Sequence, residues 1–597
     1  MASAEWRQCF KSETSEGIYA NLIRSVGDDF HSMFAFHFNL FVLRECGDPI
    51  VDTVDMALEM LSDNDLFPDV QKLAEEKSDA KAEEFRLKGN AFFKYKKNVK
   101  AIEEYNKSAC YAVSKEKISL AIANRSAVFF EMRMFRECLE SIRMAREFGY
   151  PERLKEKLDR REANCKESLE EREPPRVGKF KPKIDLPVNE KIPFVAKCLA
   201  LRHDRKYGRK IVTTKEIHAG TIIAIDEPFS KVLLGSTQYM RCATCLVEVP
   251  HLLFACNQCT QTMFCSQACQ EEAMKDFHVI ECPINGALFK IFDMGLRIVF
   301  RTVISAFLLF ADPNTMAGAV MKIERERKNV FNFDWSGAVS AEQRYAPIHN
   351  MLTKEKKLKE NSDFKNHVNT ALIFNLLKNN SSQFSQRFLT SDKAEKFLKK
   401  IIFRYVVLCP MNAYSFDTIM ENEHLDDFYY GGGMHGFRTL INHSCNPNIC
   451  INTMGTRSVV MTVKKIVAGE QLFANYSCNF KYMEKSMRQL VLHKQHDFHC
   501  ECVACTKNFP MLPFLREPKT IPKVPLHATR AHCCSCRFDV KNATEGFYAV
   551  RKYLRKYGHR YPTSQICIAE EELKYCLDIM SGNVPLVLRE KARLIEL

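Results

Sequence analysis

The sequence lacks both an apolar leader and an apolar run long enough to cross a membrane. Its first residues, MASAEWRQCF, contain no basic segment leading into an apolar run with a small-residue cleavage site, so no secretory signal is expected. The longest apolar stretch, from Leu296 to Ala311, is interrupted by Arg297 and Arg301 and is too short for a bilayer. Neither secretion nor membrane insertion is expected.

A dense tract of one charge sign is also missing. The net charge of +14 could attract nucleic acid or an acidic partner, but it is spread along the chain, so direct nucleic-acid binding is not expected. Hydrophobic residues make up 46% and charged residues 27%, the balance of a soluble globular protein. A chain of 597 residues is longer than one hydrophobic core usually organises, which predicts several domains.

Cysteine, in contrast, is abundant. Without a secretory route, the 25 cysteines are interpreted as metal ligands and free thiols rather than disulfides, because the cytosol and nucleus are reducing. Nucleus and cytoplasm are equally compatible with this composition.

Residues 81–172 are predicted to form a helical repeat array. Gly89 and Ala101 in a first segment, and Ala127 and Ala145 in a second, are small residues that let paired helices approach closely. Their spacing resembles tetratricopeptide repeats of about 34 residues. Two repeats and a following helix, Glu152 to Glu171, are expected.

A β domain split by two insertions is predicted downstream. Short β-branched runs such as Thr221 to Ile225 precede a cysteine-rich block, a long helical segment follows, and strand patterns return near Ser458 to Val463. The fold class is therefore α+β and multidomain. The predicted boundaries are an N-terminal helical region 1–80, repeats 81–172, a linker 173–190, the first part of the β domain 191–241, the cysteine-rich block 242–282, a helical insert 283–405, the β core 406–480, a cysteine segment 481–510 and a C-terminal helical region 511–597.

The cysteine-rich block has the ligand number of two closed metal sites. Two tetrahedral zinc ions need eight ligands, and C-x2-C spacing lets a turn aim two thiolates at one ion. The ligands are Cys242, Cys245, Cys256, Cys259, Cys265, Cys269, His278 and Cys282.

The order of these residues resembles the MYND zinc finger. The resemblance implies interleaved ligation, with Cys242, Cys245, Cys265 and Cys269 on one ion and Cys256, Cys259, His278 and Cys282 on the other. The family usually has Trp before the histidine, where this chain has Phe277, a difference expected to affect packing more than ligation. Saturated ligation predicts a structural role. Relatives use this finger to hold proline-rich peptides, which is a partner expectation here.

A second motif runs from Asn442 to Asn448 (NHSCNPN). It is followed by GEQLFANY, ending at Tyr476, and by FHCECVAC, ending at Cys505, with GRKIV upstream from Gly208. This order resembles the SET methyltransferase fold with an inserted MYND finger and a post-SET zinc cluster. With the repeats, the type-four branch of the SET and MYND domain family is the nearest resemblance, over roughly residues 80–510.

The resemblance implies S-adenosylmethionine as cofactor and protein-lysine N-methyltransferase activity on a histone or non-histone protein. It assigns cofactor binding to Arg209, Asn442, His443, Tyr476 and Phe498, and catalysis to Tyr476. It also implies a third zinc ion, held by Cys445, Cys500, Cys502 and Cys505. The alternative function is a non-catalytic adaptor, a transcriptional or chaperone scaffold that uses the finger and the repeats.

Two departures from the family pattern concern the methyl-transfer site. Lys210 replaces a glycine of the first loop, and His496 stands where relatives often have a second channel tyrosine. Gly431, Gly432 and Gly433 lack the Lys-Ser or Lys-Thr that follows in a phosphate-binding loop, and they are interpreted as a flexible loop.

The repeats carry residues close to the carboxylate-clamp positions of chaperone-binding tetratricopeptide domains. Heat-shock chaperone C-terminal tails are therefore an expected partner, while the alternative is an ordinary solvated helical surface. The clamp residues are Arg86, Asn90, Asn124, Lys157 and Arg161.

Overall fold

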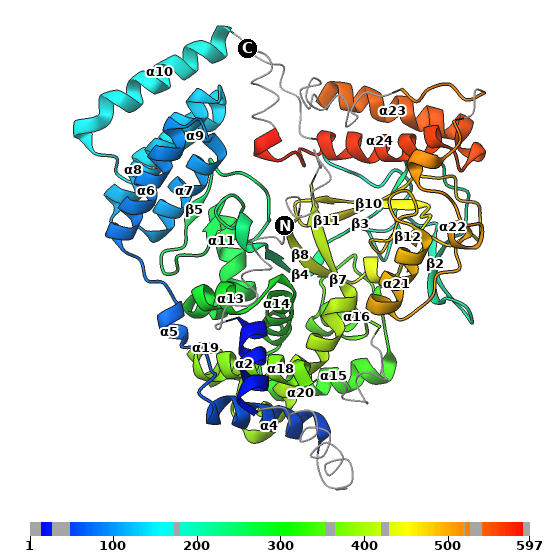
Figure 1. Ribbon diagram of the computed structural model, residues 1–597, viewed down its shortest axis with the longest axis horizontal. Helices are drawn as coiled ribbons and strands as arrows, with labels where there is room; N and C mark the ends of the chain where they lie inside the picture. The colour runs from blue at the N-terminus through cyan, green and yellow to red at the C-terminus, as the bar shows by residue number, and fades with distance from the viewer. Residues whose placement is uncertain are drawn as a thin grey trace.

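The computed structural model describes residues 14–26, 48–171, 180–352, 364–418, 429–517, 520–525 and 540–588. It is an α+β structure in which the helices of residues 79–171 lie on one side and the strands on the other, with helices between and below them (Figure 1). Within the described residues no single helix is long and apolar enough to cross a membrane; α14 and α15 pass that test only as a pair bent by 104°.

The N-terminal helices pack against the helical insert. Ile18, Leu22, Val54 and Leu61 are buried in the same core cluster as the apolar residues of that insert. These helices are α2 (Ser15–Val26), α4 (Pro49–Asp63) and α5 (Val70–Leu73). The described helices of the predicted N-terminal helical region 1–80 thus pack on a segment that follows them by more than two hundred residues.

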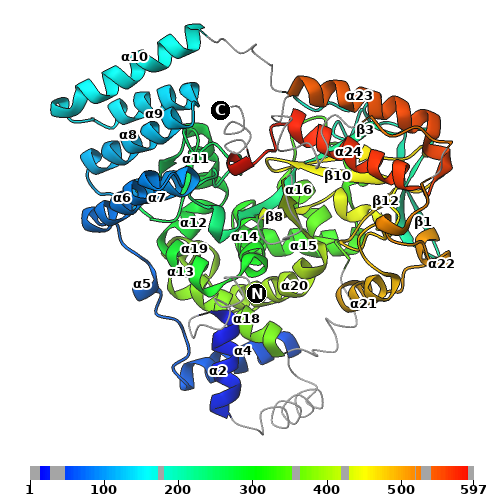
Figure 2. The ribbon, with the colours of Figure 1, turned by 45° about the horizontal axis from the view of Figure 1, so that its top comes forward.

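The repeat array consists of two antiparallel helix pairs and one further helix (Figure 2). Its helices are α6 (Asp79–Lys94), α7 (Asn98–Tyr111), α8 (Lys115–Glu131), α9 (Phe135–Glu147) and α10 (Lys155–Glu171). Gly89 shows why a small residue is needed, since a Cβ atom there would lie 2.5 Å from the ring of Tyr105. Two pairs and a following helix match the sequence prediction.

The cysteine-rich block contains a short hairpin and one helix that continues as a π turn. Its elements are β5 (Phe254–Ala255), β6 (Met263–Phe264), α11 (Gln267–Ala273), η3 (Met274–His278), α12 (Val279–Glu281) and η4 (Cys282–Ile284). Ser266 caps α11 by accepting a hydrogen bond from the N–H of Cys269 at 3.2 Å. The cap fixes the start of the helix that carries Cys269 and leads to His278.

The predicted helical insert is present and forms the largest apolar core. Phe300, Phe307, Phe384 and Phe388 are fully buried in it. Its helices are α13 (Asn285–Ile291), α14 (Met294–Leu308), α15 (Pro313–Glu326), α16 (Ala341–His349), α18 (Phe364–Asn379), α19 (Ser382–Phe388) and α20 (Asp392–Asn412).

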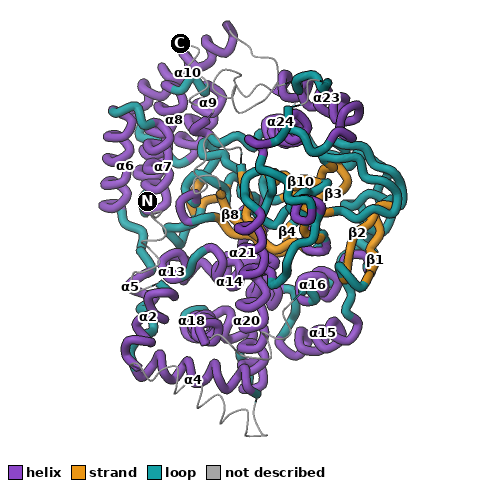
Figure 3. Tube along the Cα trace, turned by 45° about the vertical axis from the view of Figure 1, so that its right-hand side comes forward, coloured by secondary structure: helices purple, strands orange, loops and turns teal. Residues whose placement is uncertain are grey.

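The strands form several small sheets that are grouped beside the helices (Figure 3). One sheet has the order β10-β11-β3 and another the order β4-β8-β7, while β1 pairs with β2 and β9 pairs in parallel with β12. The strands are β1 (Leu199–Asp204), β2 (Gly208–Thr213), β3 (Ile222–Asp226), β4 (Pro228–Leu233), β7 (Ala413–Asp417), β8 (Tyr429–His435), β9 (Asn442–His443), β10 (Ile449–Met454), β11 (Arg457–Thr462) and β12 (Phe473–Ala474). β3 and β4 precede the insertions and pair with strands that follow them, as predicted for a split β domain.

The interpretation of Gly431, Gly432 and Gly433 as a flexible loop was wrong. They lie in β8, the central strand of its sheet, and are buried. A Cβ atom on Gly431 would lie 2.3 Å from the carbonyl oxygen of Val232, so only glycine fits between the neighbouring strands. The glycine run serves close packing within the sheet.

Two antiparallel C-terminal helices cover the β10-β11-β3 sheet. They are α23 (Val540–Tyr557) and α24 (Ser564–Met580). Their apolar residues share a core with Ile222, Val459 and Met461 of the sheet. The prediction of a helical C-terminal region, with its best segment near Glu570 to Met580, is confirmed in the described part.

Candidate functional site

The motif at Asn442 lies where two short strands meet. Asn442 and His443 form β9, which pairs with Phe473 and Ala474 of β12. The Asn448 side chain joins the two segments, because its Nδ2 donates to the carbonyl of Gln471 and its Oδ1 accepts from the N–H of Phe473, both at 2.8 Å. The motif is thus held against the strand that leads to Tyr476.

Asn442 also contacts the predicted cofactor loop. Its Nδ2 donates to the carbonyl oxygen of Arg209 at 2.8 Å. The Arg209 guanidinium donates from Nη1 to the carbonyl of Asn350 at 3.4 Å, while its buried Nε has no hydrogen-bond partner among the described residues. Burial lowers the pKa of Arg209 from its ordinary value. A largely buried cation with donors to spare suits the carboxylate of an amino-acid moiety, such as that of S-adenosylmethionine.

His443 connects this site to a cluster of cysteines. Its Nδ1 accepts a hydrogen bond from the main-chain N–H of Tyr476 at 3.0 Å, and its Nε2 lies 3.3 Å from Sγ of Cys445. Burial lowers the pKa of His443 to about 3, so the imidazole is neutral at physiological pH.

Aromatic rings complete the site. The ring of Tyr476 lies 5.2 Å from that of His443 and 4.9 Å from that of His496, and Phe498 lies 6.0 Å from His443. Burial raises the pKa of Tyr476, which keeps its phenol protonated. The structure therefore brings Arg209, Asn442, His443, Tyr476 and Phe498 together, with His496 beside Tyr476.

Lys210 is held by a carboxylate of the neighbouring strand. Its Nζ pairs with Oδ2 of Asp204 at 2.5 Å across the β1–β2 hairpin. Its side chain is therefore tied to the neighbouring strand, whereas Arg209 reaches Asn350.

The cysteine-rich block forms both predicted four-ligand groups. In each group the ligand atoms all lie within 4.8 Å of one another. Sulfur atoms of neighbouring ligands are 3.6 Å apart for Cys245 and Cys265, and 3.7 Å apart for Cys256 and Cys282. Zn–S bonds of about 2.3 Å in a tetrahedron place sulfurs about 3.8 Å apart, so this geometry fits zinc.

The third group, Cys445, Cys500, Cys502 and Cys505, is also assembled. Sγ of Cys505 lies 3.5 Å from Sγ of Cys445, although the two residues are 60 positions apart. Arg488, on α21 (Lys485–His496), is fully buried beside it and reaches Cys505 Sγ at 3.7 Å. Sequence reasoning missed this cation, which would offset the negative charge of four thiolates around one zinc ion.

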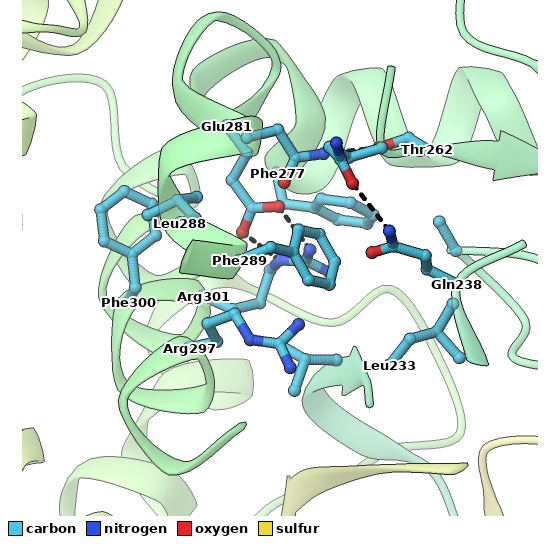
Figure 4. A pocket seen from close by; sticks show the side chains of 14 residues that line it. Leu233, Gln238, Thr262, Phe277, Glu281, Leu288, Phe289, Arg297, Phe300 and Arg301 are labelled. Carbon is cyan, nitrogen blue, oxygen red and sulfur yellow. Dashed lines mark hydrogen bonds and ion pairs between the residues drawn. The ribbon is translucent and has the colours of Figure 1, made fainter. Parts of the chain in front are cut away.

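Phe277 packs as expected for a residue outside the ligand sets. It is 4% exposed, and the guanidinium of Arg301 lies 3.5 Å from its ring centroid. Both residues line a pocket with a volume of about 30 Å³, where Arg301 pairs with Glu281 (Figure 4). That volume holds about two water molecules, so the pocket is too small for a cofactor.

Arg125, which sequence reasoning also missed, joins the repeat array to the cysteine-rich block. It is fully buried on α8, and its guanidinium donates to the carbonyl oxygens of Leu253 at 2.9 Å and His251 at 2.8 Å. Burial lowers its pKa to about 9. No local sequence pattern marks this residue, because its acceptors come from a segment more than a hundred positions away.

Among the predicted clamp residues, Asn90 bonds to the hydroxyl of Tyr105 and to Asn124. Asn90 accepts through Oδ1 from Tyr105 Oη at 2.8 Å and from Asn124 Nδ2 at 2.9 Å. Arg161 donates to the carbonyl of Ala123 at 2.9 Å.

The other two clamp residues differ in their surroundings. Arg86 is paired with Glu83, with Nε 3.2 Å from Oε2. Lys157 is exposed on α10. The structure thus brings Asn90 and Asn124 into contact and ties Arg86 to an acidic neighbour.

The split sheets and the motif between β9 and β12 define a SET-domain protein, and the profile of the SET domain family matches residues 208–477. The protein-lysine N-methyltransferase SMYD4 of Danio rerio is 23% identical over 555 residues, covering 80% of this chain and 71% of the relative. SMYD4 of Mus musculus is 23% identical, covering 70% of this chain and 66% of the relative. The histone-lysine N-methyltransferase SMYD3 of Mus musculus is 24% identical over 301 residues, half of this chain and 59% of its own length. The chain thus carries a SET domain, and over most of its length it is similar to SMYD4 proteins of the SET and MYND methyltransferases.

Proposed function

We propose that this chain is an S-adenosylmethionine-dependent protein-lysine N-methyltransferase. The observation that carries the proposal is the site in which Asn442 contacts Arg209 and His443 supports the main chain of Tyr476. Relatives along most of the chain are named protein-lysine N-methyltransferases, and others are named histone-lysine N-methyltransferases. The substrate is a protein with a target lysine, histone or non-histone.

The residues of the site have separable roles in this proposal. Arg209 holds the cofactor carboxylate, Asn442 and His443 hold the cofactor through main-chain and side-chain atoms, and Phe498 packs on the adenine. When bound, S-adenosylmethionine supplies a methyl group on a positively charged sulfur. The neutral phenol of Tyr476 donates its proton to the carbonyl of Ile441, so its oxygen accepts one hydrogen bond from the lysine amine. This bond orients the amine lone pair without trapping the amine as an ion pair.

The three cysteine groups are proposed to hold three zinc ions. Two of them build a MYND finger, and the third is a post-SET cluster that pins the segment carrying Phe498 to Cys445. The closed four-ligand sets support a structural role, because no position is left for a substrate. Proline-rich peptides are the proposed partners of the finger.

The helix pairs of residues 81–171 are proposed to be tetratricopeptide repeats. The contact between Asn90 and Asn124, from the first helices of successive pairs, supports a common groove for a peptide carboxylate. Heat-shock chaperone C-terminal tails have that chemistry.

Direct detection of methyl transfer tests the proposed function. The full chain would be incubated with core histones or a panel of lysine-containing proteins and with S-adenosylmethionine carrying an isotopically labelled methyl group. Label in a protein lysine, lost when lysines are blocked beforehand, supports the proposal. Cofactor binding without transfer to any protein would instead favour the adaptor.

A further inference from the structure

Arg438 places a positive charge between Tyr414 and the segment that holds Asn442. It begins the short helix η7 (Arg438–Leu440), directly before the segment that holds Asn442. Its guanidinium carbon lies 3.8 Å from the ring centroid of Tyr414 on β7. Arg438 is joined to Tyr476 through Ile441, whose N–H donates to the carbonyl of Arg438 at 3.1 Å and whose carbonyl accepts from Tyr476 Oη at 2.6 Å. Arg209 and Arg438 both act to lower the pKa of that phenol, against the larger effect of burial.

A buried network fixes the position of Arg438. Its main-chain N–H donates to Oδ2 of Asp226 at 2.9 Å, and its Nη1 donates to Oγ of Ser458 at 3.3 Å. His435 lies between these two groups, 3.4 Å from each. Asp226, His435 and Ser458 are each less than 5% exposed and come from three different strands. The guanidinium is therefore pre-positioned by the sheet.

The charge of Arg438 is not cancelled by direct pairing. No carboxylate among the described residues lies within ion-pair distance of its guanidinium, and its Nε has no hydrogen-bond partner there. Asp226 on β3 and Asp417 on β7 act on it from farther away, and Tyr414 and Tyr476 are protonated neighbours. Burial lowers the pKa of Arg438, but an arginine stays charged at physiological pH.

We propose that Arg438 is a positioning residue for protonation, whose fixed positive charge disfavours the ammonium form of the target lysine at the methyl-transfer site. This inference rests on the proposed function. Only the neutral amine has a lone pair, so the ammonium must first give its proton to water. The amine nitrogen then forms the N–C bond as the S–C bond breaks, and the methylated product releases its extra proton to water. A like charge nearby favours the deprotonated form.

Ligand binding tests the charge effect without any protein substrate. S-adenosylmethionine is positive at sulfur, whereas S-adenosylhomocysteine is neutral there, so the field of Arg438 should penalise only the first. We expect Arg438→Met to shift the ratio of the two Kd values by about tenfold in favour of S-adenosylmethionine, with Arg438→Lys keeping the parental ratio. Isothermal titration calorimetry on folded proteins measures both constants. An unchanged ratio in Arg438→Met overturns the inference, and failure of the parental protein to bind either ligand overturns the proposed function with it.

The pH dependence of transfer gives a second, independent readout. In single-turnover assays with core histones as the probe, Arg438→Met should raise the apparent pKa of the rate by about one pH unit, because the amine holds its proton more tightly. Arg438→Lys should leave the profile near the parental one. Asp417→Asn, which removes a negative charge that acts on Arg438, should shift the profile the opposite way and serves if Arg438→Met does not fold. Identical profiles in all folded variants overturn the inference, whereas absence of transfer by the parental protein to core histones and to the panel of lysine-containing proteins counts against the proposed function.

Discussion

The hydroxyl group of Tyr476 donates a 2.6 Å hydrogen bond to the carbonyl oxygen of Ile441. Ile441 directly precedes Asn442, so the phenol is tied to the segment that carries the predicted cofactor ligands. The same tyrosine receives support through its main chain from His443. Both ends of Tyr476 are therefore oriented by one short stretch of chain.

Replacing Tyr476 by Phe should separate catalysis from folding. The change removes one oxygen and keeps the ring, so methyl transfer should fall by about a hundredfold or more while S-adenosylmethionine still binds. The carbonyl of Ile441 loses its donor, which should lower the free energy of unfolding by about 1 kcal/mol. Rates on a validated substrate, calorimetry and urea unfolding measure the three effects. A variant that binds cofactor normally and methylates at the parental rate would show that Tyr476 merely packs.

Three zinc ions should copurify with each chain. Their ligands are the three groups of sulfur and nitrogen atoms, and thiolate ligation is coupled to folding. Elemental analysis of unchelated protein should give about three zinc ions per chain, and Cys502→Ser should lower this number toward two. Strong chelators should reduce both helical content and the melting temperature. One ion or none in well-folded protein would refute the assignment.

A peptide ending in Glu-Glu-Val-Asp should bind the repeat groove. Asn90→Ala should weaken peptide binding by about tenfold, because the substitution removes an amide shared with Asn124 and Tyr105.

Glu83 holds Arg86 and Lys117, and their hydrogen bonds lower the pKa of Glu83 to about 2. Glu83→Gln should therefore free cationic donors and strengthen binding. Fluorescence anisotropy with an amidated peptide as control checks this, and equal binding of the amidated form counts against a carboxylate clamp.

Lys464 should make stability depend on pH above neutrality. Burial lowers its pKa to about 8, although Glu570 lies 3.7 Å away and acts in the opposite direction. Because the folded pKa of Lys464 lies below its unfolded value of 10.5, the charged lysine lowers the free energy of unfolding in full below pH 8. This loss of stability becomes smaller as the pH rises from 8 toward 10.5. Lys464→Met should thus raise the free energy of unfolding by about 1 kcal/mol at pH 7, since Glu570 keeps Lys481 at 2.9 Å. Denaturant unfolding should show that Lys464→Met raises the free energy of unfolding less at pH 9.5 than at pH 7. A larger increase at pH 9.5 would contradict the lowered pKa of Lys464.

Local spacing predicted much of the site. C-x2-C pairs and the NHSCNPN motif restrict geometry over a few residues, which marked the ligand residues. The grouping of Cys242 with Cys265, and of Cys445 with Cys505, came from the order of motifs in the family, and the structure has the same groups. The two helix pairs were predictable because a small residue such as Gly89 lies where paired helices touch.

Groups that depend on distant pairing were not predictable. Arg438 reaches Asp226 only because β8 and β3 belong to sheets assembled from separate parts of the chain. Gly431 looked like a loop residue because nothing local reveals that Val232 lies against it. Arg125 likewise gains its acceptors from another domain.

The pairing of β3 with β11 has a consequence for biosynthesis. Thr221 donates to Thr462 across this part of the β core, yet the two residues are 241 positions apart. A ribosome therefore releases the cysteine-rich block and the whole helical insert before the partner of β3 exists. Until then, the apolar edge of β3 is open to wrong pairing with other chains. Nascent chains stalled before residue 457 should thus need a chaperone more than chains stalled after 480. Early binding of zinc to the cysteine-rich block would order that block before β11 is made.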